Sequence, residues 1–285
     1  MIKTFANKMR LYSPLIKSPQ TLLLVVTGMA GYMTVRCPVY NLATIAGLLA
    51  SLLASISGST VLNMWWDRDI DAKMNRTRKR PTASGAISPS EALTLGLVLS
   101  ILGLGLALAM DVLYGLIIFA GLFFDVVVYT IWLKRRTPWS IVWGGISGGM
   151  PILAGRVLGL GSFDWVGIML SLGILFWIPT HILTFSMRYY DDYKAAEIPT
   201  FSSAFGFEVT RVTIAISSIL AALAMVLAAL GIGMDWGFLS LLAVLSISLV
   251  LMAVNMILRP SERRNFGLFK YASVYMLSSM ILMVV

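Results

Sequence analysis

The chain has 285 residues, a formal net charge of +9 and a mean hydropathy of +0.86. Hydrophobic residues make up 58% of it and charged residues only 12%, whereas charged residues are about a quarter of an ordinary soluble domain. This composition excludes a soluble globular protein and predicts an all-α, polytopic membrane protein. No basic groove interleaved with aromatic residues is present, so the positive charge predicts membrane orientation and an anionic ligand, with no nucleic-acid partner.

Nine apolar stretches are long enough to cross a lipid bilayer, since a transmembrane helix needs about 20 apolar residues. They predict nine transmembrane helices in a single membrane-embedded domain that covers residues 1–285. Only Asp111 and Gly115 separate the third stretch from the fourth. The predicted spans are Gln20–Val35, Leu42–Asn63, Ala92–Met110, Val112–Leu133, Trp139–Val157, Trp165–Met187, Val212–Gly231, Trp236–Leu258 and Leu268–Val285.

The distribution of basic residues predicts the orientation of these spans. If the amino terminus is cytoplasmic, 20 of the 22 Lys and Arg residues fall in cytoplasmic connectors, and only Arg36 and Arg156 fall on the other side. This bias satisfies the positive-inside rule, so we expect a multi-pass protein of the cell membrane with a cytoplasmic amino terminus. Residues 1–18 are expected to form either an interfacial helix or a disordered basic tail. Cys37 is the only cysteine, which excludes an internal disulfide.

Three polar residues follow the second apolar stretch at intervals of four: Asn63, Asp67 and Asp71. On a helix that continues out of the stretch they share one face. Two carboxylates at this spacing repel each other and are costly beside an apolar helix, so a cation is expected near them. Mg²⁺ binds one or two carboxylates and completes its coordination with water and phosphate oxygens. The pattern therefore predicts a Mg²⁺ site that also holds a phosphate group.

A basic connector comes directly after these residues and suits such a phosphate group, because Arg and Lys side chains hold phosphate oxygens. Asp69 lies on the opposite face of the same helix and is expected to pair with Arg68, Lys73 or solvent. The basic residues of the connector are Lys73, Arg76, Arg78, Lys79 and Arg80.

The fourth predicted span carries Asp125 inside an apolar run, four residues before Tyr129. An intramembrane carboxylate either belongs to a functional site or forms a structural pair with an arginine, and the sequence leaves both possibilities open. Lys134 lies at the end of the span, as a membrane anchor or as a phosphate ligand.

The sixth predicted span supplies a second polar group. His181, the only histidine, precedes Arg188, Asp191 and Asp192 near the end of the span. A lone histidine in an apolar helix is more often a packing residue than a ligand. The adjacent aspartates cannot share one helical face, so we expect one of them to join a site and the other to be solvated.

These motifs together resemble the UbiA superfamily of intramembrane prenyltransferases. The resemblance rests on Asn63-xxx-Asp67-xxx-Asp71, on Arg76 to Pro81 and on Tyr129-Thr130-xx-Leu133-Lys134. The adjacent aspartates of the second region, together with Pro179-Thr180-His181, are most similar to the haem O synthase group. Ser140 and Met150 depart from the usual pattern of that group.

The resemblance implies nine helices around a central cavity, with Mg²⁺ and an isoprenyl diphosphate (farnesyl or geranylgeranyl) at its cytoplasmic mouth. It implies haem B as the hydrophobic acceptor. It also implies that His181 lies near the porphyrin or orients a water molecule. It further implies Asn63, Asp67, Asp71, Asp191 and Asp192 as the metal ligands. The implied diphosphate and substrate contacts are Arg68, Arg76, Arg80, Lys134 and Arg188, with Tyr129 stabilising the allylic cation.

Two alternatives are left open by the residues. An aromatic quinone precursor or a glycerol-phosphate lipid could be the acceptor of the same chemistry. A cation-coupled transporter would also need intramembrane carboxylates, but it predicts them near the midplane on paired broken helices. Here the acidic residues lie beside basic loops, which favours the prenyltransferase.

Overall fold

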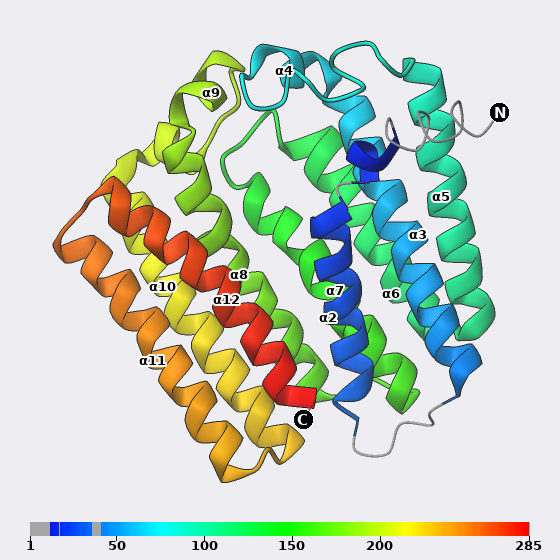
Figure 1. Cartoon of the computed structure of the whole chain (residues 1–285), viewed down its shortest axis with the longest axis vertical. Helices are drawn as coiled ribbons and strands as arrows, with labels where there is room; N and C mark the ends of the chain where they lie inside the picture. Colours follow the sequence, from blue (N-terminus) through cyan, green and yellow to red (C-terminus); the bar gives the residue numbers. More distant parts are fainter. Residues whose placement is uncertain (1–11, 17, 36–40, 285) are drawn as a thin grey trace.

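The structure is a computed structural model that describes residues 12–16, 18–35 and 41–284, and it is a bundle of long helices (Figure 1). The predictions for residues 1–11 and for Cys37 lie outside the described residues. The elements are η1 (Ser13–Ile16), α2 (Ser18–Met33), α3 (Leu42–Trp66), α4 (Arg68–Lys73), α5 (Pro89–Met110), α6 (Val112–Leu122), η2 (Phe123–Leu133), α7 (Ser140–Leu160), α8 (Trp165–Arg188), α9 (Tyr190–Ala195), α10 (Phe201–Ile232), α11 (Trp236–Leu258) and α12 (Glu262–Val284).

The predicted all-α membrane fold is confirmed. Eight helical segments of the described chain are long and apolar enough to cross a membrane, with α6 and η2 acting as one span, and the shorter apolar segment Gln20–Met33 corresponds to the first predicted span. Asp111 separates the third and fourth spans, because its carboxylate accepts a hydrogen bond from the Tyr114 amide at 2.7 Å and caps α6.

Helix α10 differs from its prediction at its beginning. Its first turn begins at Phe201, before the predicted Val212, where Thr200 and Ser203 form a reciprocal cap, and the element is kinked at Gly206, whose φ of 79° and ψ of 167° are not helical. The Thr200 hydroxyl accepts from the Ser203 amide at 3.2 Å, and the Ser203 hydroxyl accepts from the Thr200 amide at 2.9 Å. Such a cap satisfies donors that the first turn of a helix otherwise leaves free. Apolar runs alone therefore underestimate this helix.

Two large hydrophobic clusters form most of the core of the bundle. One is formed mainly by α8, α10, α11 and α12, around residues such as Leu170 and Met225. The other is formed by α2, α3, α6 and α7, around residues such as Leu52 and Tyr114. A cavity of about 870 Å³ lies between them and is lined by α2, α3, α6, η2, α7, α8 and α12. The fold thus keeps the centre of the bundle open.

Both acidic segments lie at the same end of the bundle, where α4 and α9 are neighbours (Figure 1). Ile70 and Met74 pack in one cluster with Ala196 and Ile198. An apolar contact therefore joins the two acidic segments at this end of the bundle.

Candidate active site

The cavity opens beside α4 and contains most of the polar residues that the sequence singled out. Its volume of about 870 Å³ lies in the upper part of the usual range for small-molecule sites, about 300–1,000 Å³. The predicted site residues that line it are Asn63, Asp67, Asp71, Arg76, Arg80, Tyr129, Lys134 and His181. Asp125 and Tyr193 line it as well.

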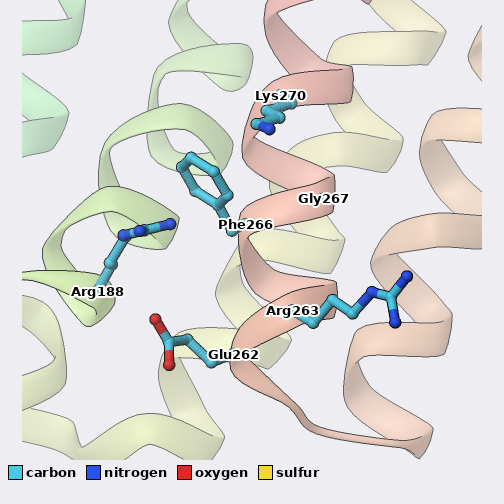
Figure 2. Close-up of a pocket in the computed structure, with 6 residues that line it drawn as sticks. All are labelled: Arg188, Glu262, Arg263, Phe266, Gly267 and Lys270. Atoms are coloured by element: carbon cyan, nitrogen blue, oxygen red, sulfur yellow. The ribbon is translucent and has the colours of Figure 1, made fainter.

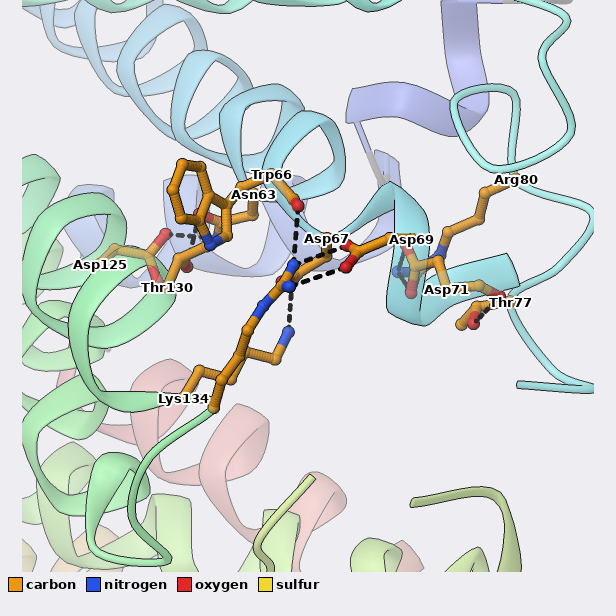
Figure 3. Close-up of polar contacts among 11 residues, drawn as sticks. Asn63, Trp66, Asp67, Asp69, Asp71, Thr77, Arg80, Asp125, Thr130 and Lys134 are labelled. Atoms are coloured by element: carbon orange, nitrogen blue, oxygen red, sulfur yellow. Dashed lines mark hydrogen bonds and ion pairs between the residues drawn. The ribbon is translucent and has the colours of Figure 1, made fainter. Parts of the chain in front are cut away.

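Asp67 lies where α3 ends and α4 begins, with 3% of its surface exposed. Its Oδ2 atom pairs with the ammonium group of Lys134 (Figure 3), and Arg135 lies 3.8 Å from Oδ1. Within the described part of the chain Oδ1 accepts no hydrogen bond. Burial raises the pKa of the Asp67 carboxyl, and the cations of Lys134 and Arg135 oppose this shift without cancelling it. The site can therefore accommodate further positive charge at Asp67.

Asp71 is held in a separate ion pair one helical turn further on. Arg80 Nη1 donates to both Asp71 carboxylate oxygens, at 2.8 and 2.7 Å. The Thr77 hydroxyl donates to the Asp71 backbone carbonyl at 3.0 Å and holds the connector against α4. Asp71 is 3% exposed. Two buried carboxylates and two cations thus line the mouth of the cavity (Figure 3).

Asn63 and Asp125 form a polar network deeper in the cavity. The Asn63 side-chain amide donates to Asp125 Oδ2 at 2.9 Å, and the Ser59 hydroxyl donates to the same oxygen. The Thr130 hydroxyl donates to Asn63 Oδ1 at 2.8 Å. Both ends of the Asn63 amide are therefore used within the protein, which makes it a positioning residue for Asp125 in this arrangement.

The second half of the fourth span is a π-helix, which the sequence did not predict. In this element the Lys134 amide donates to the Tyr129 carbonyl at 2.8 Å, five residues back. Residues five apart are thus stacked along one face, so Tyr129 and Lys134 both face the cavity. The ammonium group of Lys134 is 5.7 Å from the centre of the Tyr129 ring. A side chain at Gly144 would crowd that ring, because its Cβ would be 2.8 Å from Tyr129 Cδ2.

Aromatic residues form the opposite wall of the cavity. The His181 ring stacks between Trp177 and Phe269, with centroid distances of 4.8 and 4.4 Å and interplanar angles of 26° and 27°. Arg76 extends from the connector after α4, and its guanidinium carbon is 5.0 Å from the centre of the Phe185 ring on α8. This wall offers a flat apolar surface with a basic group at its rim.

Several predicted site residues lie outside the cavity. Arg68 is exposed and donates to the Trp65 carbonyl at 2.7 Å. Arg188 lies in a separate surface cleft with Glu262 and Lys270, where its guanidinium carbon is 3.8 Å from the centre of the Phe266 ring (Figure 2). The structure thus does not bring either arginine together with Asp67 and Asp71.

The second acidic segment stands at the rim of the site. Asp191 is exposed, and Asp192 is partly buried with its Oδ1 atom 3.4 Å from the side-chain amide of Asn75. Neither residue lines the cavity. Asp69, as expected, also points away from it, but its partner is Arg135 rather than Arg68 or Lys73, with two hydrogen bonds of 2.7 Å.

The residues at the mouth fit a Mg²⁺ ion only in combination with a phosphate ligand. Among the residues that the structure describes, no group of three or more His, Cys, Asp or Glu side chains is close enough to hold a metal. Mg²⁺ does not need such a group, since it commonly takes one or two carboxylates and fills its shell with water and phosphate oxygens. Asp67 and Asp71 meet this requirement, and Asp67 Oδ1 is a buried oxygen without a hydrogen-bond donor.

A model of the UbiA prenyltransferase family matches residues 23–274. The chain belongs to the UbiA prenyltransferase family. It is therefore a transferase and a multi-pass membrane protein, and the transporter alternative is set aside.

The curated relatives and solved structures refine this result. The chain is 40% identical to protoheme IX farnesyltransferase of Archaeoglobus fulgidus over 94% of both chains. It is 36% identical to the protein of the same name from Aeropyrum pernix, over 94% of this chain and 88% of that one. Its fold is similar to a structure of digeranylgeranylglyceryl phosphate synthase (TM-score 0.82, 19% identity, 98% of both chains). It is also similar to a UbiA homolog from Archaeoglobus fulgidus bound to GPP and Mg²⁺ (TM-score 0.70, 16% identity, 96% of this chain and 100% of that one).

The sequence missed part of the cavity lining. Ser59 could have been found, since it lies four residues before Asn63 on the same helical face. Trp177 likewise lies four residues before His181. Phe269 could not have been found, because nothing in the sequence shows that α12 packs beside α8 at this level. Tyr193 follows the two aspartates directly, yet it lines the cavity when they do not.

Proposed function

We propose that the protein transfers the farnesyl group of farnesyl diphosphate to haem B in a Mg²⁺-dependent reaction within the membrane. The observation that supports this most strongly is the cavity, whose mouth holds Asp67 and Asp71 beside Lys134 and Arg80 and whose interior is largely apolar apart from one polar network. Relatives with up to 42% identity are named protoheme IX farnesyltransferase, which supports farnesyl as the donor group and haem as the acceptor.

Asp67 and Asp71 are the residues that would hold Mg²⁺, with Asp192 at the rim as a further ligand. The bound ion would neutralise negative charge on the leaving diphosphate. Lys134, Arg80 and Arg76 would bind the diphosphate oxygens. Burial lowers the pKa of the Lys134 amine, but the oxygens of Tyr129 and Asp67 outweigh burial and hold it above its usual value. Lys134 thus stays cationic where leaving-group charge develops, which is where a fixed charge accelerates ionisation.

The interior of the cavity would hold the two apolar partners. The Tyr129 ring is placed to face the allylic cation, whose charge it would stabilise through its π-electrons. The stack of Trp177, His181 and Phe269 would receive a flat macrocycle against its aromatic surface.

We infer that the end of the bundle with α4 and α9 faces the cytoplasm. Of the 22 basic residues, 20 fall in connectors at that end of the predicted topology, as the positive-inside rule requires. Proteolysis or cysteine labelling of the α4 connector in intact, inside-out and right-side-out vesicles tests this orientation.

The reaction itself is tested with the full chain purified in lipid nanodiscs. Haem B, farnesyl diphosphate and Mg²⁺ are added, and the porphyrin products are identified by mass spectrometry. A haem that carries one farnesyl group is expected, and it should disappear when EDTA is added. Diphosphate release without any farnesylated haem would contradict the acceptor, and a second incubation with geranylgeranyl diphosphate checks the donor.

A further inference from the structure

The proposed transfer needs a proton acceptor inside the cavity, and the following inference rests on that proposed function. When a vinyl group of haem B attacks C1 of the farnesyl group, the C1–O bond breaks and its electron pair leaves with diphosphate. A C–C bond forms, and a positive charge remains on the vinyl carbon next to the pyrrole ring. Water adds to that carbon and releases one proton, so haem B, farnesyl diphosphate and water give a farnesylated alcohol, diphosphate and a proton.

Three carboxylates line the cavity, and only one of them lacks a cationic partner. Asp67 pairs with Lys134, and Asp71 pairs with Arg80. Asp125 contacts no Lys or Arg within 4.0 Å in the part of the chain that the structure describes, so it is not the structural ion pair that its position in an apolar span allowed.

The hydrogen bonds of Asp125 leave one of its oxygens available. The donors from Ser59 and Asn63 both reach Oδ2, and Asn63 is itself fixed by Thr130. Oδ1 has no hydrogen-bond partner among the described residues, and it is not fully buried. Asp125 lines the cavity, so its side chain is within reach of the space where substrates would bind. One oxygen is held in place while the other is free to accept a proton.

The depth of Asp125 matches the place where the proton is released. Asp125 lies on the π-helix nine residues before Lys134, which caps the end of that helix, so Asp125 is about two turns further into the membrane. The diphosphate would lie at the level of Lys134, and the acceptor carbon must approach C1 from the side away from diphosphate. The proton is therefore released deeper than the mouth of the cavity, on the side of Asp125.

We propose that Asp125 is the general base of the transfer, which takes the proton from the water that adds to the farnesylated haem cation. Ser59, Asn63 and Thr130 position its carboxylate. His181 also lines the cavity and can accept a proton, but its ring is stacked between two aromatic rings and its Nδ1 atom lies 3.3 Å from the Ser273 hydroxyl.

The test compares Asp125→Asn with Asp125→Glu in nanodiscs, with haem B, farnesyl diphosphate and Mg²⁺. Asn keeps the size of the side chain and an oxygen that accepts from Ser59, but it cannot take up a proton. Its kcat for farnesylated haem should fall about 100-fold or more, as expected for loss of a general base, while binding of farnesyl diphosphate changes less than about 2-fold because the mouth is intact. Asp125→Glu should retain at least about 10-fold more activity than Asp125→Asn.

His181→Gln serves as a comparison and should weaken the apparent affinity for haem more than it lowers kcat.

The outcomes separate this inference from the proposed function. If the wild-type protein forms no farnesylated haem, both the acceptor and the role of Asp125 are wrong. If the wild-type protein forms it and Asp125→Asn does so at a similar kcat, only the role of Asp125 is wrong. A weakened binding of farnesyl diphosphate with unchanged kcat would likewise overturn it in favour of a structural role. Should Asp125→Asn lose thermal stability, Asp125→Glu and Asp125→Gln form a second pair of equal size, and equal activity in that pair contradicts the proposal.

Discussion

The two acidic segments lie at the same end of the bundle, but their charges are held in different ways. In the first segment Asp67 and Asp71 are each 3% exposed, and each is paired with a cation. In the second segment Asp191 is exposed, and Asp192 has one long contact, with Asn75 at 3.4 Å. The family resemblance implies that both segments bind metal, whereas in the structure only the first segment lines the cavity and the second stands at its rim.

This difference predicts separate roles for the two acidic segments. Charges that are already buried and oriented need no reorganisation when charge develops in the transition state, so they contribute most to catalysis. Charges in water at the rim are screened and gain less from a bound ligand. We therefore expect the first segment to control the chemical step and the second to tune metal and substrate binding.

The largest effect is expected for the two buried carboxylates. Asp67→Asn and Asp71→Asn should each lower kcat/KM for farnesyl transfer about 1,000-fold, because a metal contributes several kcal/mol of charge stabilisation and about 1.4 kcal/mol is a factor of ten. Initial rates at saturating Mg²⁺ measure this. The matched control is Asp235→Asn, an exposed aspartate at the N-cap of α11, a helix that begins at the end of the bundle away from α4 (Figure 1). A decrease below about 10-fold in either variant would mean that the first segment does not hold the metal.

Removal of the cation beside Asp67 should have a smaller effect and a distinct pH dependence. Lys134→Met should lower kcat about 100-fold, as loss of one transition-state donor does. Burial raises the pKa of Asp67 while Lys134 opposes the shift, so its loss raises that pKa further. Because the carboxylate form is needed to bind a cation, the acid limb of the activity profile should move to higher pH in the variant. Rate measurements from acidic to neutral pH at saturating Mg²⁺ test this, and an unmoved limb would contradict the coupling between Asp67 and Lys134.

A still smaller effect separates the two rim aspartates. Asp192→Asn should raise the Mg²⁺ concentration needed for half-maximal activity about 10-fold, within the range for groups that support a metal site. Asp191→Asn is its natural control and should change that concentration less than about 2-fold, because Asp191 is exposed and has no hydrogen bond in the described part of the chain. Mg²⁺ titrations of the transfer rate measure both variants. The opposite order would assign the ligand role to Asp191.

The same comparison shows which features of the structure can be predicted from the sequence. Apolar runs predict the membrane-crossing helices, since these depend on a composition that any membrane helix must satisfy. The four-residue spacing places Asp67 and Asp71 in the cavity, because one helical face is a local property. Arg188 could not be placed in the same way, since its position at the end of α8 does not reveal that Phe266 of α12 lies beside it.

The π-helix, like the position of Arg188, could not be predicted from the sequence. On an α-helix Tyr129 and Lys134 would lie about 140° apart, and the sequence therefore did not predict a shared face. The five-residue hydrogen bond between them changes the register. What stabilises that register is tertiary: Gly144 on α7 leaves room for the Tyr129 ring, and Asp67 on α3 pairs with Lys134. Local propensity contains no signal for either contact.

The smallest effect is expected for the acidic residue that turns away from the cavity. Asp69 is paired with Arg135 at the surface, and this hydrogen-bonded partner lowers the pKa of Asp69. Its stabilising contribution is therefore present above the pKa of the unfolded chain and is lost as the pH falls through the lower folded value. Exposed pairs contribute about 0.2–1 kcal/mol, so Asp69→Asn should lower the thermal unfolding temperature slightly at neutral pH and low salt and leave farnesyl transfer within about 2-fold of wild type. At high salt exposed charges are screened, so the unfolding temperature and the transfer rate of the variant should both approach the wild-type values.

A loss of activity as large as that of Asp67→Asn would show that the metal-binding face of the first segment includes Asp69. The contrast between buried and exposed carboxylates would then no longer explain the site.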